Sequence, residues 1–128
     1  MQSSKRRSKY NNRKTIIDDV IFDSISEAQH YVDLKQLKVE GKIQDFDLQP
    51  EIELQPGFIY KGKKFRPIKY VGDFRIFKND GSIVIQDVKG TRGYQTDVFK
   101  LKMKMLLFKF PNINFEIVVK NGKNGKKS

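Results

Sequence analysis

Cysteine and tryptophan are absent from the sequence, and histidine occurs once, at His30. The lack of cysteine excludes disulfides and cysteine-based zinc sites. A bound metal would need oxygen ligands, which favours Mg²⁺ or Mn²⁺, or Ca²⁺, over zinc and copper. Long apolar runs are missing as well, since no stretch approaches the roughly 20 apolar residues of a membrane-spanning helix. The basic start, residues 1–14, lacks the apolar run of a secretory signal, so we expect a cytoplasmic protein without a membrane partner.

Basic side chains outnumber acidic ones. The chain has 15 Asp and Glu against 26 Lys and Arg, which gives a formal net charge of +11. A field of this sign attracts polyanions and speeds their encounter with the protein. So large an excess in 128 residues predicts contact with nucleic acid. An anionic membrane surface is the competing partner, but neither end of the chain has a basic amphipathic helix with a strong apolar face.

The length predicts one folded domain. Basic, Ser- and Asn-rich residues 1–14 are expected to form a flexible arm, and residues 121–128, rich in Gly, Asn and Lys, a disordered basic tail. The folded domain would therefore span residues 15–120.

Two helices and several strands are predicted within that domain. Ser24 with Glu27 fits a capping box, and apolar spacing extends a helix to about Glu40, with His30 on its surface. A second helix is predicted over residues 96–108, with one apolar stripe and lysines on the remainder. The stripe residues are Val98, Leu101, Met105 and Phe108, and the lysines are Lys100, Lys102, Lys104 and Lys109.

Short apolar or alternating runs between Ile43 and Lys89 predict strands, and Lys78–Gly81 predicts a hairpin turn between two of them. A final strand is expected over residues 114–119. The order helix, strands, helix, strand predicts a mixed α/β fold, an α+β sandwich around one sheet. Four aromatic residues of this region are expected in the core: Phe58, Tyr60, Phe65 and Phe74.

Two aspartates stand out because each interrupts an apolar strand. Asp87 lies in the run Ile83–Lys89, and alternation places it on the same side of the strand as Lys89. Asp73 lies in the preceding apolar segment. If the hairpin turns near Asp80, the two aspartates are cross-strand neighbours with Cβ atoms about 5 Å apart. Two such carboxylates repel each other, and a divalent cation bound by both is the simplest resolution.

A structural explanation of the aspartates is the alternative. In that case a cross-strand cluster of ion pairs would neutralise them, with Lys89, Arg75 or Lys69 as the cation.

The order of these residues resembles the active-site motif of the PD-(D/E)xK nuclease superfamily. Glu27 lies on a first helix, Asp73 on a strand, and Asp87-Val88-Lys89 on the next strand. Restriction endonucleases, archaeal Holliday-junction resolvases and transposon end-cutting endonucleases belong to this superfamily. The chain departs from the motif at Gly72, where proline commonly precedes the aspartate.

The chain resembles more closely one family of small phage-encoded proteins in that superfamily, whose function is unassigned. The likeness runs from Ser8 to Val119. It is carried by Ser8–Asn12, Phe22–Ser24, Ser26–Ala28, Leu48–Pro50, Leu54–Pro56, Tyr70–Phe74 and Asp87–Gly90.

The resemblance implies a restriction-endonuclease-like core, with a mixed central sheet flanked by helices. It implies that Asp73 and Asp87 hold Mg²⁺ or Mn²⁺, with the carbonyl of Val88 as a further ligand. Glu27 would reach from its helix to a water on that ion or to a second ion. Lys89 would orient the attacking water, help to deprotonate it and offset the charge of the phosphorane. Residues 15–120 would then form a Mg²⁺-dependent endonuclease domain.

DNA is the expected substrate, in branched or recombination structures, within a bacterial host that carries a phage or prophage. A homodimer is expected by analogy with the resolvases alone. Lys64 and Arg66 are secondary candidates for phosphate contact. The residues expected to bind DNA are Lys5, Arg6, Arg7, Lys9, Arg92, Tyr94, Lys100, Lys102 and Lys104.

Two other function classes stay open. One is a non-catalytic nucleic-acid-binding protein whose acids are structural, and the other is an RNA-binding accessory protein. Incubation with supercoiled, linear and four-way-junction DNA, in Mg²⁺ or in EDTA, separates the nuclease from both.

Overall fold

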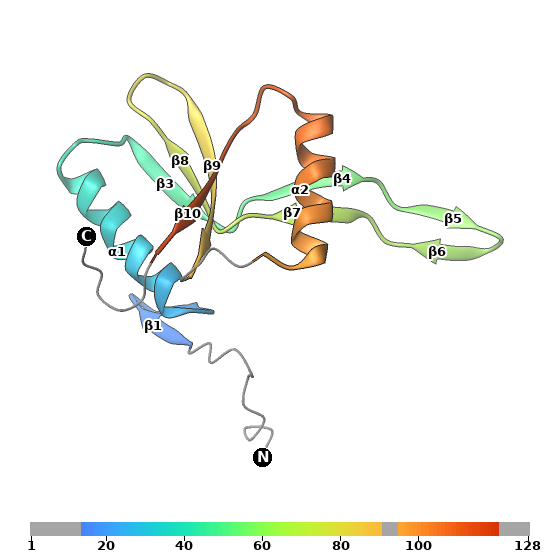
Figure 1. Ribbon diagram of the computed structural model, residues 1–128, viewed down its shortest axis with the longest axis horizontal. Coiled ribbons are helices and arrows are strands. Elements are labelled where there is room, and N and C mark those ends of the chain that lie inside the picture. The colour runs from blue at the N-terminus through green and yellow to red at the C-terminus, as the bar shows by residue number, and fades with distance from the viewer. Residues whose placement is uncertain (1–13, 91–94, 121–128) are drawn as a thin grey trace, which may run out of the picture.

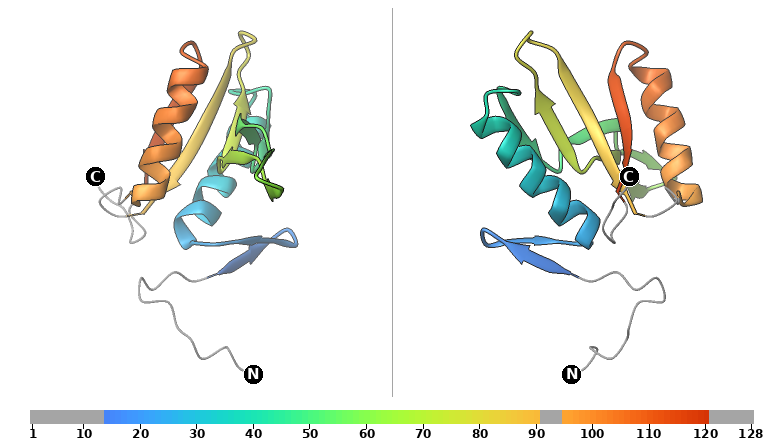
Figure 2. Two further views of the ribbon diagram at one scale, coloured as in Figure 1. Left: turned by 90° about the vertical axis from the view of Figure 1, so that its right-hand side faces the viewer. Right: turned by 60° about the vertical axis from the view of Figure 1, so that its left-hand side comes forward.

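The computed structural model describes residues 14–90 and 95–120. The predicted basic arm and tail, apart from Lys14, lie outside these residues. The described chain forms a mixed α/β fold, with its helices on the two faces of a central sheet (Figures 1 and 2). Among the described residues, neither helix is long and apolar enough to cross a membrane.

The central sheet has four strands in the order β10, β9, β8, β3. β8 (Phe74–Phe77) and β9 (Ile83–Lys89) form the antiparallel hairpin that the Lys78–Gly81 turn predicts, with Phe77 paired to Ile83. β3 (Asp45–Leu48) adds antiparallel to β8. The predicted final strand, β10 (Asn114–Val119), lies parallel to β9, so the sheet is mixed.

Helix α1 (Ile25–Val39) follows the sequence prediction closely. The hydroxyl of Ser24 accepts a hydrogen bond of 3.1 Å from the backbone N–H of Glu27, which caps the helix start. Gly41 follows the helix end with a φ of +76°. The buried face of α1 packs on one face of the sheet through an apolar cluster that includes Leu34, Phe74 and Val88.

Before α1, the chain forms a tight hairpin of β1 (Thr15–Ile17) and β2 (Val20–Phe22). Asp18 and Asp19 form its turn with φ values of 54° and 65°. Both residues therefore adopt the left-handed conformation that a two-residue hairpin loop favours.

Helix α2 (Asp97–Lys109) lies over the other face of the sheet. Leu106 is fully buried there, and it packs with Tyr70 and Ile85, while Phe99 lies at the margin of the same cluster. The apolar stripe predicted for this helix is wrong as a core face at three of its four residues, because Val98 is 61% exposed, Leu101 60% and Phe108 89%; Met105 alone of the four packs against this cluster. The core accepts Phe99 and Leu106 instead, and their spacing of seven residues defines a neighbouring stripe of the same helix.

A long hairpin completes the second face and extends beyond it. β4 (Glu51–Gln55) pairs antiparallel with β7 (Ile68–Val71), and both strands contact α2. The hairpin continues as β5 (Phe58–Tyr60) and β6 (Lys63–Phe65), which project away from the body (Figure 1).

The projection contradicts part of the predicted core. Phe74 is 1% exposed, as expected, but Phe58 is 46% exposed, Tyr60 58% and Phe65 37%. These three aromatics lie in a ribbon that no other described element covers, so alternation of apolar residues there reflects strand pairing and not burial in the core.

Candidate active site

Asp87 lies on the face of β9 that α2 and the β4–β7 pair cover. Val84 and Val88 point to the α1 side, so the alternating residues Ile85 and Asp87 point to the opposite side. The Asp87 side chain is buried, with 5% of the residue exposed. The hydroxyl of Tyr70, which is 2% exposed, donates a hydrogen bond to it.

Asp73 is held opposite Asp87, immediately before β8. Phe74, the first residue of β8, pairs with Gln86, so the register brings the residue before it to the level of Asp87, as the sequence predicts. The N–H of Asp73 donates to the carbonyl of Gln86 at 3.1 Å, and its carbonyl accepts from the N–H of Gln49 at 3.0 Å. Its carboxylate accepts from the N–H of Val88 at 2.7 Å. Backbone and side chain are therefore both fixed.

Glycine at position 72 allows the side chains of Ile85 and Tyr70 to lie close to the backbone beside Asp73. A Cβ atom at Gly72 would lie 3.1 Å from the Cγ2 atom of Ile85 and 3.4 Å from the Tyr70 ring. A larger residue would displace the side chains that surround both aspartates. The departure from proline at this position thus has a packing reason.

Glu27 reaches the same region from the first turn of α1. This turn lies against the end of β9, since a Cβ at Gly90 would be 3.6 Å from the Ser26 hydroxyl. Burial and the nearby charges of Asp23 and Asp87 raise the pKa of Glu27, and Lys89 acts in the opposite direction.

Accumulated negative charge is the main electrostatic property of this cluster. Burial, together with repulsion from Glu27 and Asp87, raises the pKa of Asp73 to about 8. Burial together with the Asp87 contact also raises the pKa of Tyr70, so its hydroxyl stays protonated and donates. Three carboxyl groups therefore share one partly buried region.

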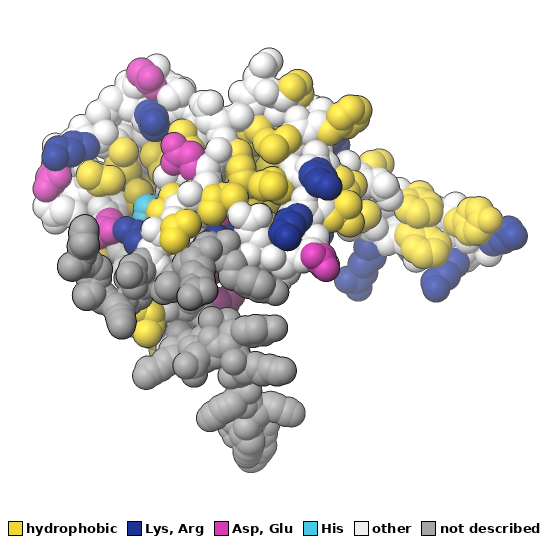
Figure 3. Space-filling view, viewed as in Figure 1, with side chains coloured by type: hydrophobic (Ala, Val, Ile, Leu, Met, Phe, Trp, Pro, Cys, Tyr) yellow, Lys and Arg dark blue, Asp and Glu magenta, His cyan; other side chains and the backbone are white. Residues whose placement is uncertain are grey.

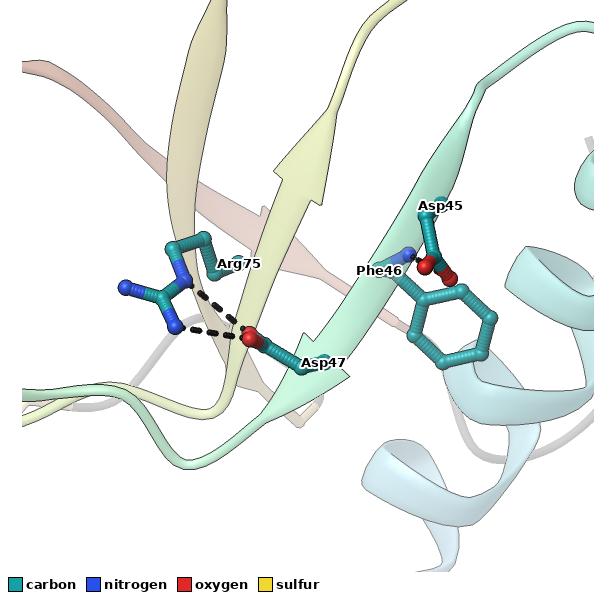
Figure 4. Close-up of polar contacts among 4 residues, drawn as sticks. All are labelled: Asp45, Phe46, Asp47 and Arg75. Atoms are coloured by element: carbon teal, nitrogen blue, oxygen red, sulfur yellow. Dashed lines mark hydrogen bonds and ion pairs between the residues drawn. The ribbon is translucent and has the colours of Figure 1, made fainter.

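The cations that could neutralise the cluster are engaged elsewhere. Arg75 makes a two-pronged interaction with Asp47 on the neighbouring strand, at 3.1 and 2.7 Å (Figure 4). Lys69 pairs with Glu51 at 3.1 Å. The Lys89 ammonium lies 3.7 Å from the centre of the Phe99 ring. Across residues 14–90 and 95–120, no ion pair within 4 Å joins a cation to Asp73 or Asp87, so the structural explanation loses its expected partners.

The backbone carbonyl of Val88 points toward the edge of β9 where Asp73 lies. In a strand, the N–H and C=O of one residue point to the same edge, and the Val88 N–H donates to Asp73. The next carbonyl, of Lys89, faces β10 and accepts from the Lys120 N–H at 2.8 Å. Within the described residues, no three side chains of Asp, Glu, His or Cys are arranged to ligate one ion together. Two carboxylates and a backbone carbonyl suit Mg²⁺, which retains several waters.

The opposite face of β9 carries a different polar cluster. His30 is 7% exposed, so the prediction of a surface position is wrong: α1 turns this residue toward the sheet. Its Nε2 atom lies 2.7 Å from the Gln86 amide oxygen, and the Gln86 amide donates to Glu116 at 2.8 Å. Burial lowers the pKa of His30.

The residues predicted to bind DNA are only partly described. Lys100 and Lys104 are exposed on α2 and Lys102 is half-buried. The first turn of that helix adjoins Lys89 through Phe99. Lys5, Arg6, Arg7, Lys9, Arg92 and Tyr94 lie outside the described residues.

Comparison with protein families gives one match. The sequence model of the family described as "Protein of unknown function (DUF1064)" matches residues 7–126. The chain belongs to this family. Neither the comparison with curated proteins nor that with solved structures finds a match for this DUF1064 chain. The family description assigns no activity, so the chemistry of the DUF1064 site is argued from its own residues.

Tyr70 is the site residue that sequence reasoning missed. It lies in β7, three residues before Asp73, but its partner is Asp87 on β9. The contact depends on how β7 packs across the sheet, which alternation within one strand does not reveal.

Proposed function

We propose that this protein is a Mg²⁺- or Mn²⁺-dependent endodeoxyribonuclease with a restriction-endonuclease-like core. The observation that carries the proposal is the Asp73–Asp87 pair. The two carboxylates lie opposite each other, just before β8 and on β9, with no ion pair to a cation among the described residues, and Lys89 follows on the same face. This is the arrangement expected of the PD-(D/E)xK motif, reached here from strand register and burial.

Each residue has a role that its surroundings support. Asp73 and Asp87 would hold the ion, with the Val88 carbonyl beside them. When bound, the ion would lower the pKa of water, polarise the phosphoryl oxygen and stabilise the leaving alkoxide. Glu27 would accept a proton from the attacking water, and its raised pKa makes its carboxylate a stronger base than an ordinary glutamate. Lys89 would orient that water and offset negative charge on the phosphate.

The positive charge of the chain supports DNA as the substrate. With a net charge of +11, the protein attracts the phosphate backbone despite the local acidic cluster. We include in the proposal a preference for branched DNA and a homodimeric state, both by analogy with the resolvases.

A nicking assay tests the proposal. Supercoiled, linear and four-way-junction DNA are incubated with the protein in Mg²⁺, Mn²⁺, Ca²⁺ or EDTA. We expect cleavage in Mg²⁺ and Mn²⁺, binding with little cleavage in Ca²⁺, and none in EDTA. Lys89→Ala should remove cleavage, whereas Lys78→Ala, an exposed lysine in the β8–β9 turn, should leave it unchanged. Binding without cleavage in every metal would favour the non-catalytic nucleic-acid-binding protein.

A further inference from the structure

The β-ribbon, defined as β5 and β6 with the turn between them (residues 58–65), is exposed along its whole length. All six strand residues are exposed. Within the described chain, the two strands make substantial contact only with each other. The ribbon is therefore not there to cover the core.

The ribbon supports its own structure. Phe58 and Phe65 are cross-strand partners, and their rings stack with centroids 4.9 Å apart and planes at 11°. The ammonium of Lys63 lies 5.3 Å from the centre of the Phe65 ring, and that of Lys61 lies 5.4 Å from the centre of the Tyr60 ring. These contacts stabilise a two-stranded hairpin, which is marginal on its own. They also hold a row of positive charges in place.

The charge of the ribbon has one sign. Residues 57–67 contain Lys61, Lys63, Lys64 and Arg66 and no acidic residue. In the space-filling view, basic and apolar side chains alternate along this projection (Figure 3). On charge and size, the ribbon fits a groove of duplex DNA. Two strands about 4.8 Å apart enter a major groove about 12 Å wide, which admits a two-stranded β-ribbon.

The position of the ribbon relative to the acids suits the same ligand. Lys63 precedes Asp73 by ten residues along β6 and β7. At about 3.3 Å per residue of extended chain, Lys63 is at most about 33 Å from Asp73. One turn of B-form duplex is about 34 Å long. A duplex whose scissile phosphate lies at the acids can therefore meet the ribbon within one turn.

We propose that the β-ribbon is a duplex-binding element that enters a DNA groove and anchors the substrate within about one helical turn of the acidic site. Lys61, Lys63 and Lys64 contact phosphates on the two sides of the groove, while the stacked phenylalanines keep the ribbon rigid. A single strand is the less suitable ligand, because Phe58 and Phe65 already stack on each other and Lys63 covers the Phe65 ring. The inference rests on the proposed function only in taking DNA as the partner.

The test measures binding in a background that does not cleave. Both test proteins carry Asp87→Asn, and the probes are a 40-base-pair duplex and a single strand of the same sequence. The ribbon variant is Lys61→Gln/Lys63→Gln/Lys64→Gln. The matched control, Lys38→Gln/Lys42→Gln/Lys78→Gln, removes the same charge from the end of α1 and the β8–β9 turn.

We expect the ribbon variant to bind duplex about tenfold more weakly at low salt. Its log–log salt slope should flatten by about 2 to 3, which corresponds to three lost phosphate contacts. The control should retain most of the affinity. Equal losses in the two variants, no loss in the ribbon variant, or a loss confined to the single strand would each overturn the proposal.

A second variant tests the ribbon as a whole. Replacing residues 56–67 by Asn-Gly joins Gln55 to Ile68, which are already cross-strand partners. With Asp87 intact, we expect unchanged Mg²⁺-dependent hydrolysis of thymidine 5′-p-nitrophenyl phosphate and a strong loss of duplex cleavage. Loss of both activities in a folded protein would overturn a binding role. Absence of hydrolysis in the wild type, with ribbon-dependent binding intact, would reject the nuclease and keep the ribbon.

Discussion

Gln86 and Asp87 are neighbours on β9, yet they belong to two polar clusters that differ in kind. On the α1 side, His30, Gln86 and Glu116 form a chain of hydrogen bonds of 2.7 and 2.8 Å. On the α2 side, Asp87 lies with Asp73 and Glu27, and its hydrogen-bond donor is the neutral hydroxyl of Tyr70. The first cluster joins donors to acceptors, although the buried Nδ1 atom of His30 has no hydrogen-bond partner among the described residues, whereas the second accumulates acceptors.

The difference indicates which of the two clusters a bound cation would stabilise. Buried polar groups that find partners are part of an ordinary interior. Buried carboxylates without cations raise one another's pKa and destabilise the fold at neutral pH, unless a cation joins them. The α2-side cluster therefore resembles a site that is complete only with a metal ion, in keeping with the proposed nuclease.

The largest expected effect is on cleavage. Asp87→Asn should lower the rate of Mg²⁺-dependent DNA cleavage by about 10³-fold or more, because groups that act as a unit fail together. Glu116→Gln, on the other face of the sheet, should change that rate by less than about threefold. Cleavage rates of both variants on supercoiled plasmid test this prediction. A wild-type rate in Asp87→Asn would place the chemistry elsewhere.

The next effect concerns stability and metal together. The pKa of Asp73 is raised to about 8, so the folded protein holds a proton that the unfolded chain releases above about pH 4. Stability without metal should therefore fall as pH rises between these values. Asp73→Asn keeps an acceptor for the Val88 N–H, and we expect it to raise Tm at pH 7 and to flatten this pH dependence.

Addition of Mg²⁺ provides a second comparison of the wild type with the Asp73→Asn protein. At ten times its Kd, the ion should stabilise the wild type by about 1.4 kcal/mol, or a few degrees in Tm. The Asp73→Asn protein should gain little. Differential scanning fluorimetry with and without Mg²⁺ measures both quantities, and equal gains in the two proteins would argue for binding at another place.

A smaller effect is expected for the Tyr70 hydroxyl. Tyr70→Phe removes the donor to the buried Asp87 carboxylate and should lower the free energy of unfolding by about 1–3 kcal/mol. Tyr31→Phe is the matched control, because its hydroxyl donates to the exposed Asp18 at 2.8 Å and should contribute less than about 1 kcal/mol. Urea unfolding without metal compares them. Equal losses would mean that burial of the Asp87 contact has no energetic consequence.

The smallest expected effect lies on the α1 side. Burial lowers the pKa of His30, so its neutral form is favoured in the folded protein. As pH falls below the ordinary histidine pKa of about 6.5, the unfolded chain takes up a proton first and stability is lost. His30→Gln should reduce the fall in Tm between pH 7.5 and 5.5. The same fall in both proteins would assign it to other groups.

Much of the central sheet and of α1 was predictable from local signals. The Ser24 cap, the Lys78–Gly81 turn and the alternation around Asp87 are short-range patterns, and together they set the register that brings Asp73 to Asp87. The restriction-endonuclease-like core and the catalytic roles stay predictions, because they depend on chemistry that a fold alone does not establish.

The remaining features depend on which tertiary neighbour is present. The apolar residues of α2 lie on two adjacent stripes, and only packing against Tyr70 and Ile85 selects Phe99 and Leu106. Likewise, His30 is buried because α1 turns that position toward Gln86. The strand pattern at Phe58 to Phe65 is that of a half-buried sheet, but no second layer covers it.

Anomalous diffraction from crystals grown with Mn²⁺ tests the central claim most directly. We expect a peak between the carboxylates of Asp73 and Asp87, with oxygen ligands at about 2.2 Å and the Val88 carbonyl among them. The Asp73→Asn/Asp87→Asn protein should show no peak at that position. Two results would contradict the assignment of these acids to a metal-dependent active site. One is a wild-type peak at another position. The other is the absence of any peak at saturating Mn²⁺, with the Tyr70 hydroxyl still hydrogen-bonded to Asp87.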